Sequence, residues 1–308
     1  MNSKIKQKIT PTLWFDSKAE EAMSFYVSVF PNSKINFVKR WPEDVSFPDE
    51  AIKPRTIQMA SFTLDWMQFY AFDAGPAFKF NTSISFCAFF ETVAEIKEVW
   101  SKLAEGGEVL MPLKKYDWSE QYGWIKDRYG VSWQIAKEEL INVGQPITPL
   151  IMFSGKHRGE AKEAIDLYMW VFDDSIIHGI ARYEEGDRGP YGMVKLGQCR
   201  LVGQTFMMMD NGTANDIPFN EAISFYLNCH DQKEVDYYWS KFTKEGSESQ
   251  CGWLKDKFGV SWQIVPEFLT DKIENGEPSR VNNMLEAIYQ MKKLDVAQLM
   301  EAYNKDVE

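Results

Sequence analysis

The side chains best suited to binding a small molecule alternate with apolar residues in short segments rich in β-forming residues. Alternation along a strand places every second residue on the same face of a sheet. Three such segments, at residues 9–15, 83–90 and 131–136, collect polar and aromatic groups on one face: Thr10, Thr12 and Trp14, then Ser85, Cys87 and Phe89, then Ser132 and Gln134. An apolar wall with a few hydroxyl and amide groups is typical of a small-molecule pocket. The sequence therefore favours ligand binding as the chemistry of these strands.

Residue types that commonly hold metal ions are scarce. The chain contains three histidines and four cysteines, with no C-x-x-C motif: His157, His178, His230, Cys87, Cys199, Cys229 and Cys251. Zn²⁺ and Ni²⁺ prefer imidazole, thiolate or carboxylate ligands, and the first half of the chain has no histidine at all. We interpret the histidines as surface or capping residues. The cysteines are interpreted as reduced thiols, which predicts a cytoplasmic protein without a disulfide framework.

Length, composition and charge exclude several classes of protein. The 308 residues include 45 acidic and 34 basic side chains, a formal charge of −11, and 44% hydrophobic residues. This is an ordinary globular composition, so extensive disorder is excluded. No apolar run approaches the ~18 residues of a membrane span, and the first residues lack the apolar core of a signal peptide. Because the acidic excess repels phosphate groups, we expect neither nucleic-acid nor membrane partners.

The chain is a tandem repeat. The segment GWIKDRYGVSWQI at residues 123–135 returns as GWLKDKFGVSWQI at residues 252–264, with ten of thirteen positions identical. ITPTLWF near the start likewise returns as ITPLIMF at residues 147–153. Such a long period is not that of a solenoid and indicates two duplicated domains. The predicted division is an N-terminal tail at 1–8, repeats at 9–142 and 147–270, and a helical tail at 271–308.

Each repeat is predicted to contain a strand, a helix and three strands, twice over. In the first repeat the strands are expected at residues 9–15, 34–41, 55–64, 66–73, 83–90, 121–127 and 131–136. Asp16-Ser17 and Glu91-Thr92 are the predicted N-caps of the two helices, because short polar side chains accept hydrogen bonds from free helical N–H groups. The strands and helices together predict an α+β fold of four modules.

Acidic residues recur at the ends of strands, and the tail changes pattern. Asp127 and Asp256 precede tight turns, and Asp73 and Asp210 are interpreted as turn residues in the same way. After Thr270, apolar residues at helical spacing predict two amphipathic helices. Their apolar faces are expected to cover a sheet or a partner subunit.

The modules and the closing hairpin resemble a known superfamily. Paired βαβββ modules with FY-x-x-x-F in the first helix and D-x-x-G-V-S-W-Q-I in the last hairpin are similar to those of vicinal oxygen chelate proteins. That superfamily includes glyoxalase I, extradiol dioxygenases and the fosfomycin and bleomycin resistance proteins. ITPTLWF, FYVSVFPNSKI and the tail MLEAIYQMKKLDVAQLMEAY narrow the resemblance to the PhnB-like branch, which carries the label 3-demethylubiquinone-9 3-methyltransferase. The resemblance implies tandem vicinal oxygen chelate domains built from four βαβββ modules, with a C-terminal helical tail.

The resemblance also implies which positions line the cup that each domain forms. Members of the superfamily commonly hold a divalent metal there, on His, Glu or Gln from the first and last strands of the modules. In this chain the implied lining is Thr10, Trp14, Tyr70, Ser85 and Gln134 in the first repeat, and Thr148, Met152, Met207, Ser224 and Gln263 in the second. Hydroxyl, thioether and neutral amide groups are weak ligands for such metals. We therefore predict no metal site, in cups bounded by Thr10, Ser85 and Gln134, and by Thr148, Ser224 and Gln263.

Three functions follow as hypotheses. The first is a small-molecule binding protein that uses no metal. The second is a metal-dependent lyase, isomerase or resistance enzyme of the glyoxalase type with atypical ligands, and the third is a structural or regulatory interaction protein. Methyl transfer from S-adenosylmethionine usually needs a Gly-rich turn between a strand and a helix, and the sequence offers none in such a place. We expect no S-adenosylmethionine site and no other cofactor, with a divalent metal as the alternative.

The resemblance bears on assembly as well. Family members of half this length commonly pair two chains, so the two repeats are expected to pair internally. Strand exchange between the repeats and a further homodimer both stay open.

Overall fold

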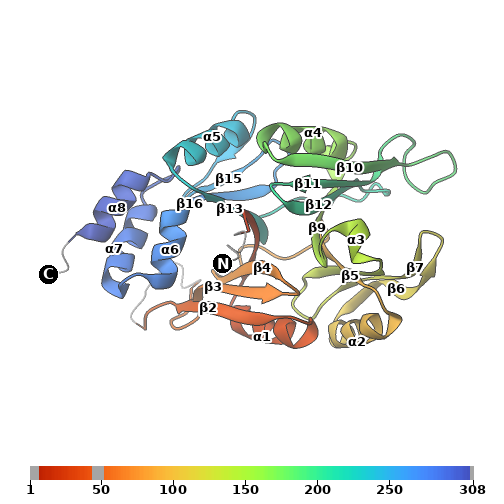
Figure 1. Cartoon of the computed structure of the whole chain (residues 1–308), viewed down its shortest axis with the longest axis horizontal. Coiled ribbons are helices and arrows are strands. Elements are labelled where there is room, and N and C mark those ends of the chain that lie inside the picture. The colour runs from red at the N-terminus through yellow and green to blue at the C-terminus, as the bar shows by residue number, and fades with distance from the viewer. Residues whose placement is uncertain (1–6, 44–51, 306–308) are drawn as a thin grey trace.

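Two curved sheets lie side by side, with helices on their outer faces and a group of three helices at one end (Figure 1). This computed structural model describes residues 7–43 and 52–305. Most of the predicted N-terminal tail, residues 1–8, lies outside the described residues, as do the last three residues of the C-terminal tail. None of the helices in the described ranges is long and apolar enough to cross a membrane.

The first repeat contains the two predicted βαβββ modules. The first module consists of β1 (Ile9–Phe15), α1 (Ala19–Val29), β2 (Lys34–Arg40), β3 (Ile57–Leu64) and β4 (Met67–Asp73). The second consists of β5 (Ile84–Phe90), α2 (Val93–Ala104), β6 (Glu108–Tyr116), β7 (Ser119–Lys126) and β8 (Ser132–Lys137), followed by the one-turn helix α3 (Leu140–Val143). The sequence pattern did not predict the strand β6.

The second repeat contains the other two modules and the tail. Its first module has β9 (Ile147–Phe153), a short 3₁₀ turn (Gly155–His157), α4 (Ala161–Val171), β10 (Ser175–Arg182), β11 (Val194–Leu201) and β12 (Gln204–Asp210). Its second has β13 (Ile223–Cys229), α5 (Gln232–Thr243), β14 (Ser247–Glu248), β15 (Trp253–Lys255) and β16 (Ser261–Pro266). The tail forms α6 (Glu267–Asn275), α7 (Pro278–Ile288) and α8 (Val296–Asn304). The predicted α+β fold of four modules with a helical tail is confirmed, but the tail has three helices instead of two and begins before residue 271.

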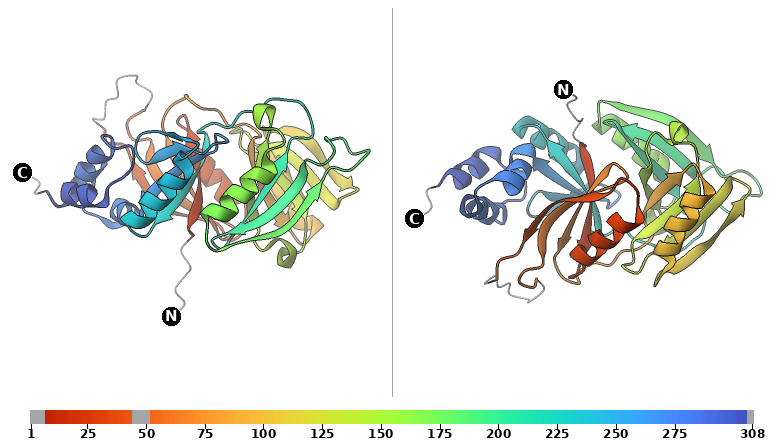
Figure 2. Two further views of the ribbon diagram at one scale, coloured as in Figure 1. Left: turned by 90° about the horizontal axis from the view of Figure 1, so that it is seen from above. Right: turned by 60° about the horizontal axis from the view of Figure 1, so that its bottom comes forward.

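Each sheet is built from one half of each repeat. Sheet A has the strand order β14-β15-β16-β13-β1-β4-β3-β2, and sheet B has the order β10-β11-β12-β9-β5-β8-β7-β6. In sheet A, β1 pairs antiparallel with β13, which places Thr12 opposite Ser224. In sheet B, β5 pairs antiparallel with β9, which places Cys87 opposite Thr148. The repeats therefore exchange modules in both sheets, as the crossing of colours in Figure 2 shows.

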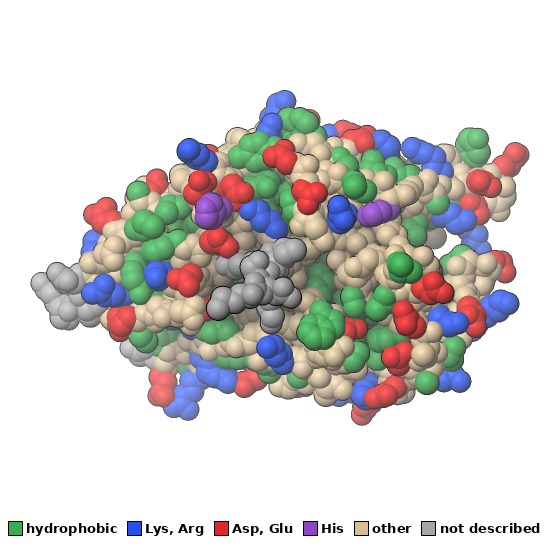
Figure 3. Space-filling model, viewed as in Figure 1, with side chains coloured by type: hydrophobic (Ala, Val, Ile, Leu, Met, Phe, Trp, Pro, Cys, Tyr) green, Lys and Arg blue, Asp and Glu red, His purple; other side chains and the backbone are tan. Residues whose placement is uncertain are grey.

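The main core lies between the outer faces of the sheets and the four long helices α1, α2, α4 and α5. It is one contiguous cluster in which the largest fully buried side chains are aromatic, among them Trp133, Trp262, Tyr26 and Tyr168. Large rings bury much apolar area each, which accounts for part of the aromatic content of the sequence. Charged side chains of both signs are interspersed over the face shown in Figure 3.

The helix caps show how distant strands position the helices. The predicted Thr92 cap of α2 is confirmed, with a capping box to Glu95. The predicted Asp16-Ser17 cap of α1 is wrong, because Asp73 at the end of β4 accepts the Ala19 N–H at 2.9 Å instead. Its second oxygen accepts the Ile57 N–H at 2.9 Å. Asp73 is therefore a structural clamp between α1 and β3, and Asp210 repeats this role in the second repeat.

A buried carboxylate joins the two modules of each repeat. Asp127, in the turn between β7 and β8, accepts the Tyr26 hydroxyl at 2.8 Å and the Trp133 indole N–H at 2.9 Å on the same oxygen. Its other oxygen accepts the N–H groups of Tyr129 and Val131. Burial raises the pKa of Asp127, and the donated hydrogen bonds oppose that shift. Because α1 packs on sheet A and the turn belongs to sheet B, this contact fixes one sheet against the other.

Removing one hydrogen-bond donor from the Asp127 carboxylate should destabilise the folded protein. We expect Tyr26→Phe to lower the free energy of unfolding by about 1.5–3 kcal/mol, because it removes a hydrogen bond to a buried charged group. The measurement is equilibrium unfolding in urea. Tyr129→Phe is the matched control, since that hydroxyl reaches only the exposed Glu21 at 3.2 Å, and it should change stability by less than about 0.5 kcal/mol. Equal effects of the two substitutions would contradict the role given to Asp127.

Candidate functional site

The predicted site residues fall into two concave faces, but not in the grouping that the sequence suggested. Strand exchange brings Thr10, Trp14 and Tyr70 together with Ser224 and Gln263 on sheet A, which we call cup A. It brings Thr148, Met152 and Met207 together with Ser85 and Gln134 on sheet B, which we call cup B. The predicted groups of Thr10 with Ser85 and Gln134, and of Thr148 with Ser224 and Gln263, are therefore wrong. Each cup draws on both repeats.

The two cups share a polar core. In cup A the Gln263 amide donates to Ser224 Oγ at 2.9 Å, and in cup B the Gln134 amide donates to Ser85 Oγ at 2.9 Å. The hydroxyls of Thr10 and Thr148 are both buried and have no hydrogen-bond partner among the described residues. These features recur at matching positions of the duplication, so by themselves they do not distinguish the cups.

Cup A is filled by the C-terminal tail. Tyr70 and Tyr226 meet edge to face at its floor, with ring centroids 4.9 Å apart. The Tyr226 hydroxyl bonds to Thr270 Oγ1 of α6 at 2.9 Å. These two rings form one buried cluster with apolar residues of the last strand and the three tail helices: Val265, Leu269, Val281, Met284, Ile288, Leu294 and Leu299. Of the two expected roles of the tail, covering a sheet is the one observed.

Backbone contacts hold this tail in place. The N–H groups of Cys251 and Gly252, just before β15, donate to the carbonyls of Met291 and Lys292 in the link between α7 and α8, each at 2.7 Å. Val296 at the start of α8 donates its N–H to the Gln232 amide oxygen at 2.7 Å. The tail therefore covers the concave face of sheet A as part of the fold, and its apolar side chains occupy cup A.

Cup B has smaller floor residues and a much smaller cover. Met207 and Cys87 occupy the positions that Tyr70 and Tyr226 occupy in cup A. In place of α6, sheet B is followed by the single turn α3, which ends at Gly144 in the left-handed conformation. The apolar lining of cup B is a separate cluster: Cys87, Phe89, Val143, Leu150, Met152 and Met207, with half-buried Trp124, Ala136, Leu140, Met209 and Ile217 around it.

In cup B a third residue extends the Gln–Ser pair. The Tyr122 hydroxyl donates to the Gln134 amide oxygen at 2.8 Å, and Gln134 passes its own N–H to Ser85. The Trp124 indole donates to Ser132 Oγ at 2.8 Å. Burial raises the pKa of Tyr122, so the phenol remains a neutral donor at physiological pH. Tyr122 is not among the site residues predicted from the sequence. Its difference from Cys251, the residue at the same position of the second repeat, is the signal that could have identified it.

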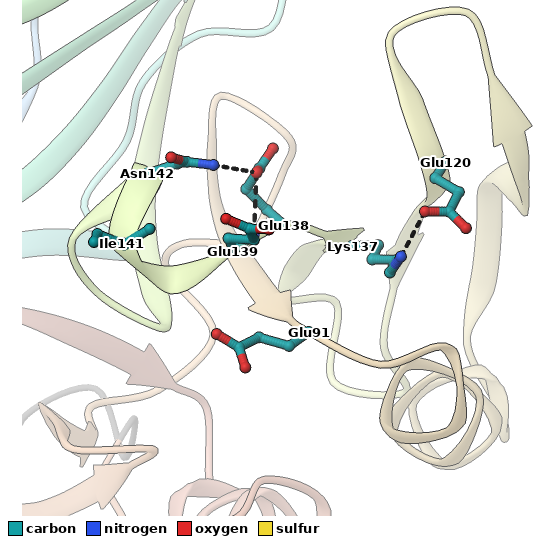
Figure 4. Close-up of a pocket in the computed structure, with 7 residues that line it drawn as sticks. All are labelled: Glu91, Glu120, Lys137, Glu138, Glu139, Ile141 and Asn142. Carbon is teal, nitrogen blue, oxygen red and sulfur yellow. Dashed lines mark hydrogen bonds and ion pairs between the residues drawn. The ribbon is translucent and has the colours of Figure 1, made fainter.

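An open pocket lies beside α3, at the end of sheet B where the parallel strands β5 and β8 finish. It has a volume of about 550 Å³ and is lined mainly by polar side chains: Glu91, Glu120, Lys137, Glu138, Glu139, Ile141 and Asn142. Figure 4 shows Lys137 of β8 bonded to Glu120 of β7, opposite the Glu138 and Asn142 contact at α3. The pocket therefore separates α3 from the β6–β7 hairpin.

The donor set of the cups does not fit the divalent metal that the superfamily commonly holds. The positions in cup B carry Thr148, Met207, Ser85 and Gln134, and the Gln134 amide is already bonded to Tyr122 and Ser85. Burial raises the pKa of the Cys87 thiol to about 12, which disfavours the thiolate that a metal needs. Within residues 7–43 and 52–305, no group of three or more His, Cys, Asp or Glu is arranged to hold a metal ion.

The architecture matches that of solved glyoxalase structures. Glyoxalase I from Zea mays covers 87% of this chain and 96% of its own length, with a TM-score of 0.56 and 11% sequence identity. At that identity the match shows the fold alone. The chain is therefore a tandem protein of the glyoxalase-like, vicinal oxygen chelate fold.

Sequence comparison identifies the branch. The family model described as 3-demethylubiquinone-9 3-methyltransferase matches residues 7–136 and 145–265, and the chain belongs to this family. A Bacillus cereus protein, described as PhnB and as a candidate 3-demethylubiquinone-9 3-methyltransferase, is 41% identical; the match covers 43% of this chain and all of that one, at a TM-score of 0.40. A Pseudomonas aeruginosa protein is 27% identical, over 41% of this chain and 94% of its own, at a TM-score of 0.35. No curated protein matches. The predicted PhnB-like resemblance is confirmed.

The two unpartnered threonine hydroxyls give a matched pair of substitutions. We expect Thr10→Val and Thr148→Val each to raise the free energy of unfolding by about 1 kcal/mol, because each removes a buried polar group without a partner and keeps the side-chain shape. Urea unfolding of both variants measures this. A loss of stability in Thr148→Val alone would mean that this hydroxyl has a partner in cup B, such as an ordered water.

Proposed function

We propose that this protein binds a small, uncharged organic molecule in cup B without a protein-bound metal. The observation that carries the proposal is the difference between the cups. Tyr70, Tyr226 and the tail fill cup A, whereas cup B has Met207 and Cys87 on its floor and the single turn α3 beside it in place of three tail helices. In a protein with two copies of the same scaffold, the less filled cup is the one available to a ligand.

The lining of cup B supports an apolar ligand with one or two hydrogen-bonding groups. Methionine, cysteine and aromatic side chains form an adaptable apolar wall. The Tyr122, Gln134 and Ser85 chain supplies oriented polar groups at one side. The residues of the cup B cluster carry no charge, so a charged group on the ligand would lose its hydration without compensation. Uncharged ligands are therefore favoured inside the cup.

Binding is favoured over catalysis by the same residues. The Cys87 thiol stays protonated because burial raises its pKa to about 12, and Tyr122 is held as a neutral donor. Neither provides the activated nucleophile or base that covalent or acid–base chemistry needs. The methyl transfer named in the family description has no support in a Gly-rich strand-to-helix turn of this sequence, and methyl transfer is not part of the proposal.

Filling cup B tests the proposal. The probe is N-phenyl-1-naphthylamine, a neutral apolar dye that fluoresces when it leaves water. We expect the double variant Cys87→Tyr with Met207→Tyr, which copies the floor of cup A, to weaken dye binding at least tenfold. Thr10→Val in cup A is the control and should leave the dissociation constant unchanged. Unchanged binding by a folded double variant would overturn the proposal; Met207→Phe is the milder second variant if the double one unfolds.

Metal analysis tests the other half of the proposal. Protein purified without chelator is expected to contain less than about 0.1 equivalent of zinc, nickel, manganese or iron by elemental analysis, because the cup donors are weak ligands. A stoichiometric metal, lost in Gln134→Ala, would instead support the glyoxalase-type enzyme hypothesis.

A further inference from the structure

The β6–β7 hairpin distinguishes the two repeats as strongly as the tail does. Its strands have 9 and 8 residues, whereas the matching β14 and β15 have 2 and 3. In repeat 2 the short hairpin leaves room for the link between α7 and α8, which bonds to Cys251 and Gly252. In repeat 1 no tail helix occupies that place, and the long hairpin extends beside cup B at the right of Figure 1.

The outer part of this hairpin carries three aromatic rings in mutual contact. Tyr116 and Trp118 are stacked, with centroids 4.8 Å apart and planes 26° from parallel. Tyr122 meets Tyr116 edge to face at 5.7 Å and Trp118 at 6.1 Å. The Trp118 side chain is nevertheless 64% exposed. The contacts hold the indole in one orientation while much of its surface stays open to another ring.

This aromatic cluster, Tyr116, Trp118 and Tyr122, connects the outside of the molecule to the polar chain of cup B. Tyr122 is both a member of the cluster and the donor to Gln134. Glu120 is two residues from Tyr122 on the same strand and therefore shares its face. Glu120 lines the 550 Å³ pocket beside α3, so the cluster adjoins that pocket through Glu120 and lies outside its lining. The volume is within the roughly 300–1,000 Å³ range of small-molecule sites.

We infer that the aromatic cluster is a stacking platform for a planar aromatic ring, which makes a planar aromatic compound the ligand class of cup B. This inference rests on the proposed function of cup B. A ring stacked on Trp118 gains dispersion and quadrupole interactions that a non-planar group of equal charge cannot make. Tyr122 then lies between the stacked ring and the Gln134 amide, where a polar group of the ligand is recognised.

The test compares two uncharged probes that differ in shape. Acridone is planar and 2-adamantanone is not, and the absence of charge on both suits the uncharged lining of cup B. We expect Trp118→Ala to weaken acridone binding about tenfold, or about 1.4 kcal/mol, in fluorescence polarisation. 2-Adamantanone, measured by calorimetry, should bind wild-type protein at least tenfold more weakly than acridone and be unaffected by the substitution. Trp118→Phe should restore most of the acridone affinity.

Trp66→Ala is the matched control. Trp66 also follows an Asp in a two-residue hairpin turn and is 72% exposed, but no ring contact involves it among the described residues. It should leave acridone binding unchanged. Equal affinity of Trp118→Ala and wild type, an equal loss in Trp66→Ala, or 2-adamantanone binding as tight as acridone would overturn the inference. These outcomes are separate from the proposed function, which fails if filling cup B leaves the naphthylamine dye bound.

Discussion

Two buried carboxylates fix the relation between the sheets, and the rest of the molecule depends on that relation. Within each repeat the first module belongs to one sheet and the second module to the other. Tyr26 from α1 donates to Asp127 of the facing sheet, and Tyr168 from α4 donates to Asp256 in the same way. A carboxylate removed from water is costly unless donors surround it, so both modules must bring their donors to one point. With the modules held apart in this manner, β1 and β5 pair with β13 and β9 of the other repeat instead of with each other.

The four modules have approximate twofold symmetry. The segments added to them, which are α3, the β6–β7 hairpin and the tail, do not follow this symmetry. The tail follows β16, the last strand of sheet A, and so covers the cup of the sheet from which it leaves. In sheet B the equivalent point, after β8, must lead on to β9 after a few residues, so there is room for α3 alone. The difference between the cups thus follows from chain order: one copy of the scaffold is followed by a short linker and the other by the tail helices α6, α7 and α8. Beside cup B, the long β6–β7 hairpin occupies the place that corresponds to the place of the α7–α8 link beside cup A.

Local features were predictable from the sequence, and long-range pairing was not. Strand alternation and the Thr92 cap depend on neighbouring residues, and both appear where predicted. The exchange of modules could not be read from the repeats, because their edges carry nearly the same residues and either pairing buries the same apolar faces. The wrong grouping of Thr10 with Ser85 is a direct consequence. The α1 cap failed for a related reason, since Asp73 lies 54 residues from the N–H that it accepts. Pro112 and the adjacent Lys114 and Lys115 interrupt the alternation of β6, so the pattern did not predict that strand.

Comparison of the repeats separates residues that maintain the scaffold from those that can confer specificity. The Gln–Ser pair and the unpartnered threonine occur in both cups, one of which is full, so they belong to the shared scaffold. Differences are informative. The Trp124 indole donates a hydrogen bond to Ser132 inside cup B. Its counterpart Trp253 instead lies against Trp14, with ring centroids 6.1 Å apart. The hydroxyl of Ser261, the counterpart of Ser132, has no hydrogen-bond partner among the described residues. The remaining differences are the smaller floor residues of cup B, its Tyr122 donor and its aromatic hairpin. Because the fold constrains both cups alike, residues that occur in one cup alone are not required by the scaffold, and the proposed ligand binding assigns its specificity to them.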